Sequence, residues 1–257
     1  MTNICKKYKT GLVLSGGGAR GFAHLGAIKA LNENGIYPDI VAGTSAGSIV
    51  GAFYCDGFQP EEIFSFFIEK GIYKYIEFII PNRGLLKING LVNLIENNLN
   101  SKYFDDLKIP FYATATDLNN ARPVYFSSGE LVPAIIASSS IPVIFQPFEI
   151  NGVTYVDGGL TDNLPVEPLK NICEKIIGIN VNPIGYQKNF NKLIDIAERT
   201  FHIAFNAGIF DKISSLDLYI QPEKLKNMGI FDVSKSPEIF NAGYQAALNA
   251  LKKTNFI

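Results

Sequence analysis

Short apolar runs alternate along the chain with stretches in which apolar residues recur at helical spacing. Residues 11–14 and 40–43 are two such runs, each of a length typical of a buried strand, and a helical pattern over residues 25–31 lies between them. Gly35 follows that pattern and supplies a stop for the helix. Strand, helix and strand in this order predict an α/β protein with a largely parallel central sheet.

The same alternation continues to the end of the chain. Further strands are predicted at residues 111–116, 124–126, 148–150, 153–156, 175–181 and 216–220. Further helices are predicted at residues 89–100, 131–137, 193–213 and 236–252. Asn151-Gly152 predicts the tip of a β-hairpin. We expect residues 1–257 to form a single domain, because no linker-like stretch or shift in composition divides them.

Residues 60–80 are more apolar than one amphipathic helix face requires. Their aromatic side chains are Phe64, Phe66, Phe67, Tyr73, Tyr75 and Phe78. Two interpretations stay open. The segment is a buried helix pair, since aromatic stripes usually belong to a core, or it is a lid or mouth that receives acyl chains and contacts a membrane surface.

Composition and charge exclude several classes of protein. The 257 residues are 47% hydrophobic, and 23 basic against 24 acidic side chains give a net charge of −1 without a basic stripe, which argues against nucleic-acid binding. Cys5, Cys55 and Cys173 are odd in number and far apart, which favours reduced thiols over disulfides or zinc. No apolar run approaches the ~18 residues of a membrane span. We expect a cytoplasmic protein, peripheral at a membrane if residues 60–80 reach one.

A serine stands where the second strand gives way to a helix, within Gly43-Thr44-Ser45-Ala46-Gly47. A strand that turns directly into a helix presents the hydroxyl on a sharp corner, and Gly43 and Gly47 remove the Cβ atoms that would clash there. The helix predicted from Ala46 to about Cys55 also directs its positive end toward this oxygen. Ser45 is therefore a candidate nucleophile.

The glycine loop after the first strand has two interpretations. Gly16, Gly18 and Gly21 fit G-x-G-x-x-G, which is typical of dinucleotide binding. That motif needs an acidic residue at the end of the second strand, but Asp39 precedes the strand. The alternative is an oxyanion hole, in which the loop offers backbone N–H groups beside Ser45.

Asp157 is the candidate base for Ser45. It follows the second strand of the predicted hairpin, and Gly158 and Gly159 leave it uncrowded. A turn aspartate is more often only a cap, but a serine hydrolase needs a base and the chain offers few.

Two histidines supply the alternative to a serine–aspartate pair. The order Ser45, Asp157, His202 matches that of an α/β-hydrolase triad. His202 lies within a predicted helix, however, whereas a triad histidine usually follows a strand, and His24 lies in the first helix. We expect a two-residue arrangement of Ser45 and Asp157, with the triad left open.

Four motifs in this order resemble the patatin-like phospholipases, and the resemblance covers nearly all of residues 11–182. They are Ser15-Gly16-Gly17-Gly18-Ala19-Arg20-Gly21, Gly43-Thr44-Ser45-Ala46-Gly47-Ser48, Ala137-Ser138-Ser139-Ser140-Ile141-Pro142 and Asp157-Gly158-Gly159-Leu160-Thr161-Asp162-Asn163-Leu164-Pro165. The resemblance implies a three-layer α/β/α sandwich and a catalytic dyad of Ser45 and Asp157. It implies an oxyanion hole made by Gly16, Gly17 and Gly18 with Arg20 nearby.

These inferences describe a hydrolase that cleaves acyl esters of lipids, of the phospholipase A or lysophospholipase type. We expect no metal and no cofactor, since no cluster of His, Cys, Asp and Glu has ligand spacing. A non-catalytic lipid-binding module and a nucleotide-binding module remain the alternatives. The sequence carries no signal for the oligomeric state.

Overall fold

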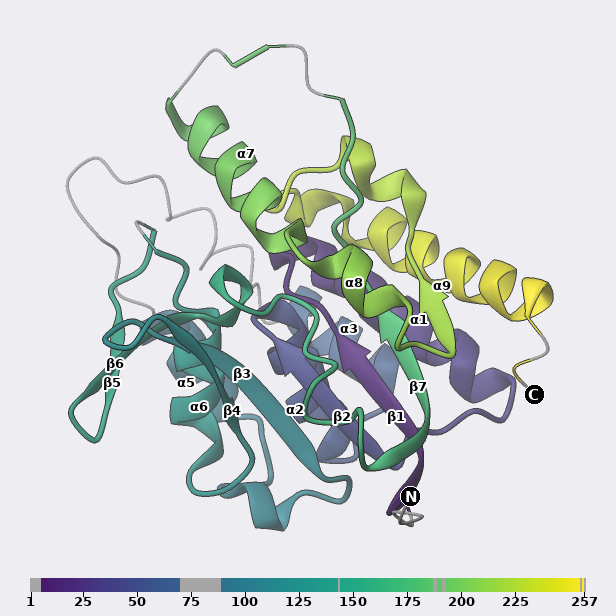
Figure 1. Cartoon of the computed structure of the whole chain (residues 1–257), viewed down its shortest axis with the longest axis horizontal. Helices are drawn as coiled ribbons and strands as arrows, with labels where there is room; N and C mark the ends of the chain where they lie inside the picture. The colour runs from purple at the N-terminus through teal and green to yellow at the C-terminus, as the bar shows by residue number, and fades with distance from the viewer. Residues whose placement is uncertain are drawn as a thin grey trace.

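The computed structural model describes residues 6–69, 89–142, 144–186, 189–190, 193–254 and 256. These residues build a central sheet with helices on both faces (Figure 1). The strands are β1 (Tyr8–Leu14), β2 (Ile40–Thr44), β3 (Phe111–Asp117), β4 (Arg122–Phe126), β5 (Phe148–Ile150), β6 (Val153–Asp157), β7 (Cys173–Ile179) and β8 (Leu218–Ile220).

The strand order in the sheet is β5-β6-β3-β2-β1-β7-β8, and β4 pairs with β3 beside this path. Strands β3, β2, β1, β7 and β8 run parallel to one another, whereas β4, β5 and β6 join in antiparallel pairs. The prediction of a mainly parallel sheet is confirmed. Because parallel strands end at the same edge, the loops after β1 and β2 lie next to each other.

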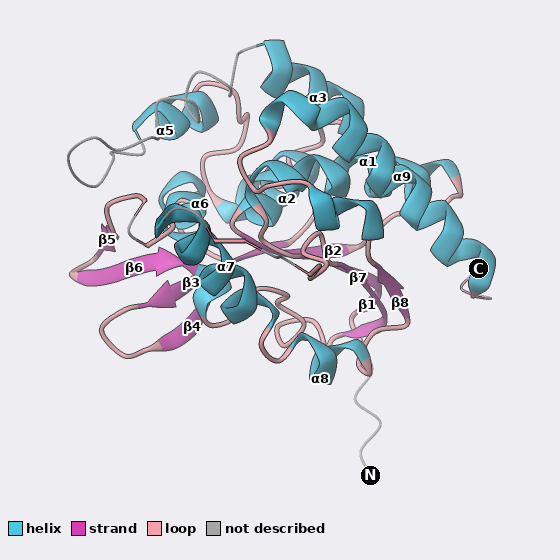
Figure 2. Cartoon of the chain, turned by 90° about the horizontal axis from the view of Figure 1, so that it is seen from above, coloured by secondary structure: helices cyan, strands magenta, loops and turns pink. Residues whose placement is uncertain are grey.

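Helices form the two outer layers of the sandwich. They are α1 (Phe22–Glu33), α2 (Ala46–Cys55), α3 (Pro60–Glu69), α5 (Asn89–Glu96), α6 (Leu131–Ser139), α7 (Leu193–Asn206), α8 (Ile209–Ile213) and α9 (Ser236–Lys253). Figure 2 shows α1, α2, α3 and α9 on one face of the sheet and α8 on the other. The three-layer α/β/α architecture is therefore confirmed.

Strand β1 is apolar on both faces because both are covered. Leu12 and Leu14 belong to the large core under the helices, while Val13 belongs to a second core on the opposite face. That second core is closed by residues 164–173 and by Ile209 of α8. Strands buried on both faces read as continuous apolar runs, which is why residues 11–14 were recognisable in the sequence.

Helix α3 packs as part of the core. Ile63 and Phe67 are buried, and the Phe64 ring contacts the rings of Phe22 and Phe240 edge-on at 5.5 and 5.0 Å between centroids. For residues 60–69 these contacts favour the interpretation as a buried helix. Residues 70–80 lie outside the described residues, so a lid or membrane contact in that part stays a prediction.

The hairpin turn follows the local chemistry, and the largest differences from the predicted elements are in the helices at 193–213 and 89–100. The hairpin forms as predicted, with Asn151 and Gly152 at φ 52° and 78° between β5 and β6. The helix predicted at 193–213 is instead two helices, because Gly208 takes a left-handed conformation at φ 77° and starts α8. Helix α5 ends at Glu96 rather than at residue 100.

Helices α1 and α9 approach each other through glycine. A Cβ atom on Gly26 would lie 1.9 Å from the carbonyl oxygen of Phe240, and one on Gly243 would lie 1.9 Å from that of Ala23. Their backbones therefore touch where any larger residue would force the helices apart.

We expect Gly243→Ala to destabilise the fold by about 1–3 kcal/mol, because an added methyl group has to overlap the Ala23 carbonyl. Thermal or urea unfolding of this variant measures the loss. Gln245→Ala is the control, since Gln245 is exposed on the same helix and alanine is a good helix former. Equal stability of Gly243→Ala and the wild type would contradict the close α1–α9 packing.

Candidate active site

Ser45 occupies a strained corner between β2 and α2. Its backbone has φ 51° and ψ −122°, a region that non-glycine residues rarely adopt and that costs about 1–3 kcal/mol. Glycines make the corner possible: a Cβ on Gly43 would lie 2.4 Å from the Gly47 carbonyl oxygen, and one on Gly47 would lie 2.5 Å from the Leu14 carbonyl oxygen. Strained backbone that the surroundings hold in place is typical of a nucleophile elbow.

Ser138 at the end of α6 braces this corner. Its hydroxyl accepts the Ser45 N–H at 2.9 Å and donates to the Thr114 carbonyl oxygen on β3 at 2.6 Å. The Ser45 carbonyl is held in turn by the N–H and the hydroxyl of Ser48, at 2.8 and 2.7 Å. The backbone of the nucleophile is thus fixed on both sides by buried hydrogen bonds, which leaves the Ser45 hydroxyl as its adjustable part.

The register of the sheet brings Asp157 to Ser45. Strand β4 pairs with residues 113–117 of β3 along one edge, so β2 and β6 must both use the other edge. On that edge Thr44 lies opposite Thr114, and Asp157 lies opposite Ala115, the next residue of β3. Strands β2 and β6 therefore meet end to end. The residues at their ends are the proposed nucleophile and base.

The Asp157 carboxylate is completely buried. Its Oδ1 accepts the Gly159 N–H at 2.8 Å, and its main-chain N–H donates to the Ser140 carbonyl oxygen at 2.9 Å. Burial raises the pKa of Asp157 to about 6, against the smaller lowering effects of hydrogen bonding from the Ser45 hydroxyl and from the Gly159 N–H. Oδ2 has no well-aligned hydrogen-bond partner in the described part of the chain, so it is available to a proton.

The glycine loop lies directly against Ser45. A Cβ on Gly16 would come within 3.1 Å of the Ser45 Cβ. The N–H of Gly16 is already engaged, because it donates to Asn163 Oδ1 at 3.0 Å. No hydrogen bond among the described residues uses the N–H groups of Gly17 and Gly18. Of the three glycines predicted to form an oxyanion hole, Gly17 and Gly18 therefore have free donors, whereas Gly16 positions the loop.

The same loop is poorly suited to a dinucleotide. A Cβ on Gly17 would lie 2.5 Å from Val181 Cγ2, and one on Gly18 would lie 2.4 Å from the Ile230 carbonyl oxygen. The glycines thus serve close packing within the protein, and Asp39 accepts the Thr10 N–H at 2.8 Å instead of facing the loop. Gly21 has a similar role, since a Cβ there would lie 2.8 Å from the Ala46 Cβ.

Arg20 and His202 form a buried pair beside the glycine loop. Arg20 Nη1 donates to His202 Nε2 at 2.8 Å, and its Nε donates to the Met228 carbonyl oxygen at 2.8 Å. Burial and the neighbouring Arg20 and Arg199 lower the pKa of His202 to about 4. No hydrogen bond in the described part of the chain joins His202 to Asp157 or Ser45. The arrangement differs from a triad, in which the histidine bridges the other two residues.

His24 lies under the loop, within the core. Its Nε2 donates to the Ser15 carbonyl oxygen at 2.8 Å, because a carbonyl can only accept. Burial lowers the pKa of His24 to about 4, so the ring is neutral at pH 7. It supports the end of β1 rather than reaching the serine.

Sequence reasoning missed the supporting residues of the site. Ser138 and Ser140 lie in a motif that carried the family resemblance but had no assigned role, and both now contact the residues that meet at the strand ends. Asn163, which lies in the motif that begins at Asp157, holds Gly16 through its side chain. One signal in the sequence could have found the two serines, because they follow an apolar run, and polar residues that become buried are hydrogen-bonded in native folds. The residues to which they bond could be identified only from the three-dimensional structure.

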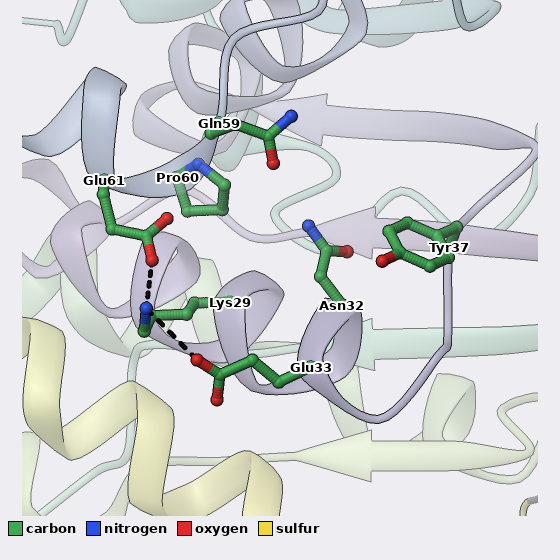
Figure 3. A pocket seen from close by; sticks show the side chains of 7 residues that line it. All are labelled: Lys29, Asn32, Glu33, Tyr37, Gln59, Pro60 and Glu61. Atoms are coloured by element: carbon green, nitrogen blue, oxygen red, sulfur yellow. Dashed lines mark hydrogen bonds and ion pairs between the residues drawn. The ribbon is translucent and has the colours of Figure 1, made fainter.

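A polar hollow of about 190 Å³ lies away from these residues, between α1 and the start of α3 (Figure 3). The side chains that line it are Lys29, Asn32, Glu33, Tyr37, Gln59, Pro60 and Glu61. Lys29 forms ion pairs with Glu33 and Glu61 there. One lysine and two glutamates leave this hollow with a net charge of −1, and neither Ser45 nor Asp157 is among its lining residues.

Known proteins share both the motifs and the fold. A family model described as patatin-like phospholipase matches residues 12–170. An uncharacterized NTE family protein of Mycobacterium tuberculosis is 32% identical over 177 residues, which are 68% of this chain and 49% of that protein. Lysophospholipase nte1 of Aspergillus fumigatus is 28% identical over 95% of this chain, which is 18% of its own length. The chain thus spans about half the length of the mycobacterial relative, and less of the fungal one.

A solved structure has a similar fold. The crystal structure of VipD from Legionella pneumophila matches 96% of this chain and 67% of its own with a TM-score of 0.56. The sequences are 15% identical, so this likeness concerns the fold alone.

Because Asp157 is buried, we expect the ionisation of its carboxylate to destabilise the fold as the pH rises from acidic values. The pKa is 3.8 for a free aspartate and about 6 when folded, so folding stability falls as pH rises between these values. Asp157→Asn removes the ionisation and keeps an acceptor for Gly159. We expect this variant to be up to about 3 kcal/mol more stable than the wild type at pH 7, and close to it at pH 4.

Urea unfolding at both pH values measures the effect. Asp117→Asn is the control with the opposite sign, because hydrogen bonds from Asn120 lower the pKa of Asp117. The gain in stability of Asp157→Asn over the wild type should be larger at pH 7 than at pH 4. An equal gain at both pH values would contradict a buried and ionised carboxylate.

Proposed function

This chain belongs to the patatin-like phospholipase family, and from that premise we propose that it hydrolyses acyl esters of lipids, as a phospholipase A or lysophospholipase. The observation that carries the proposal is the meeting of Ser45 and Asp157 at the ends of β2 and β6 beside a glycine loop with free N–H groups. Resemblance to a lysophospholipase of Aspergillus fumigatus supports the class of substrate.

In the proposed reaction Asp157 acts first as a base. It takes the proton of the Ser45 hydroxyl while Oγ attacks the ester carbonyl, and the tetrahedral intermediate collapses as Asp157 returns that proton to the leaving alcohol. Asp157 then takes a proton from water, whose oxygen attacks the acyl-serine. The fatty acid leaves, and Ser45 regains its proton from Asp157.

The pKa of Asp157 suits both roles. At about 6 it leaves most of the carboxylate ionised at pH 7, and it makes the group a far better proton acceptor than an exposed aspartate at 3.8. Burial is the cause of this shift, so the feature that destabilises the fold is also the one that makes a lone aspartate an adequate base.

The N–H groups of Gly17 and Gly18 supply the proposed oxyanion hole. The loop is fixed before substrate arrives, since Gly16 donates to Asn163, and the Ala19 N–H donates to the Ile230 carbonyl oxygen at 2.7 Å. Preorganised donors of this kind are worth about 3–4 kcal/mol each in the transition state. Arg20 holds the loop to the Met228 carbonyl and to His202.

Apolar side chains near the site suit an acyl chain. The ring of Phe205 in α7 packs next to Gly159, since a Cβ atom added to Gly159 would lie 3.0 Å from that ring. On the same helix Ile196 and Ile203 are exposed, as is Leu160 beside Gly159. Among the described helices none has the length and apolarity needed to cross a bilayer. The exposed apolar side chains of α7 and Leu160 support a lipid as the proposed substrate.

The site residues give the first test of this function. We expect Ser45→Ala and Asp157→Asn each to lower hydrolysis of a lysophospholipid by at least about 1,000-fold, because each removes a reacting group. His202→Gln should retain most activity, since glutamine still accepts a hydrogen bond from Arg20. An inactive but folded His202→Gln would favour the triad instead.

A fluorophosphonate probe separates the remaining alternatives. It should label the wild type on Ser45, and mass spectrometry of the labelled peptide identifies the residue. A non-catalytic lipid-binding module would bind vesicles without reacting with the probe. A nucleotide-binding module would gain thermal stability from a dinucleotide, which the proposed hydrolase should not.

The pH dependence of kcat gives a third test. Because the base must be ionised, kcat should fall below pH about 6 with the slope of a single ionisation. If His202 were the base, the fall in kcat would instead occur near pH 4, because the pKa of the His202 ring is about 4. The measurement needs an ester that does not itself titrate between pH 4 and 8, with circular dichroism to show that the chain stays folded.

A further inference from the structure

A partly buried ion pair, in which the carboxylate is buried and the lysine is partly exposed, lies beside the proposed site without a part in the chemistry. Asp162 is 4% exposed, and its Oδ1 forms an ion pair with Lys212 of α8. Its Oδ2 accepts the Tyr125 hydroxyl at 2.7 Å. Both carboxylate oxygens are engaged, so Asp162 cannot replace Asp157 as a base.

The pair anchors a turn that touches every part of the site. This turn, residues 158–163, begins one residue after Asp157 and is closed by the Asp162 N–H donating to the Gly158 carbonyl oxygen at 2.8 Å. The Asp162 carbonyl accepts the Thr44 hydroxyl at 2.9 Å, and Thr44 directly precedes Ser45. The next residue, Asn163, holds the Gly16 N–H.

We infer that Asp162 and Lys212 are positioning residues, which hold the 158–163 turn so that the nucleophile, the base and the oxyanion loop keep one relative geometry. The inference rests on the proposed hydrolase function. Asp162 joins them through its own main chain, which bonds Gly158 and Thr44, and through the next residue, Asn163. Lys212 fixes the Asp162 carboxylate from α8. Lys212 also donates to the Leu164 carbonyl oxygen at 3.1 Å, which secures the end of the turn.

Stability alone does not explain a pair in this place. Replacing a buried ion pair with apolar groups of similar volume is often neutral or stabilising, whereas removing one partner is strongly destabilising. In some proteins such a pair instead specifies one geometry, and this is the role that we assign to Asp162 and Lys212. Here that geometry is passed on to Thr44 by the Asp162 carbonyl and to Gly16 by the next residue, Asn163.

The test compares single variants with the double variant Asp162→Asn/Lys212→Met. Each single variant leaves a partner unmatched, so both the melting temperature and kcat should fall. In the double variant the melting temperature should return close to the wild-type value, while kcat stays about 10–100-fold lower and KM changes less than about twofold, because misplaced groups weaken the transition state. Wild-type kcat in the double variant would overturn the inference.

Two further variants keep the test decisive. Glu223→Gln/Lys226→Met removes an exposed ion pair and should change neither quantity. If the double variant does not fold, Tyr125→Phe decides, since it removes only one hydrogen bond to Asp162. We expect it to lower kcat severalfold at constant KM, and an unchanged kcat would refute the positioning role.

Hydrogen exchange separates this inference from the proposed function. Peptides covering residues 15–21 and 158–165 should exchange at least about tenfold faster in the double variant than in the wild type and in the exposed-pair control. That readout needs no ester. A chain with this exchange pattern that cleaved no ester would refute the hydrolase and leave the anchoring intact, whereas unchanged exchange would refute the anchoring.

Discussion

The structure depends on two strands that end against each other on one edge of β3. Strand β2 arrives in parallel and stops at Thr44, and β6 arrives in the opposite direction and stops at Asp157, one register position further along. Neither strand can extend past the other, so the chain must leave the sheet at this point. It leaves through a strained serine corner on one side and a glycine turn on the other.

This constraint explains why the site is both costly and precise. Ser45 carries backbone strain, and Asp157 is a buried carboxylate whose pKa is raised by its surroundings. Each would relax if the surrounding packing allowed it. The glycines at 43, 47 and 158 prevent this by letting backbones touch: a Cβ on Gly158 would lie 2.1 Å from the Thr114 carbonyl oxygen. A rigid scaffold can therefore hold groups that are unstable individually.

Much of the fold could be predicted because its signals are local. Apolar runs of strand length and the Asn151-Gly152 tip need only neighbouring residues, and both appear as expected. Ser45 and Asp157 were named from motifs, and the sheet register brings them together. The contacts of Ser138 with Ser45 and of Asn163 with Gly16 span 93 and 147 residues, so no local pattern could reveal them. The break at Gly208 was missed because a glycine inside a helical pattern is often tolerated.

The most direct measurement is a crystal structure of the protein after reaction with an alkyl fluorophosphonate. If two opposed strand ends create the catalytic centre, phosphorus will be bonded to Ser45 Oγ, its phosphoryl oxygen will face the N–H groups of Gly17 and Gly18, and the Asp157 carboxylate will lie beside the modified serine. An adduct on another residue, or a phosphoryl oxygen turned away from the glycine loop with Asp157 out of reach, would contradict the account.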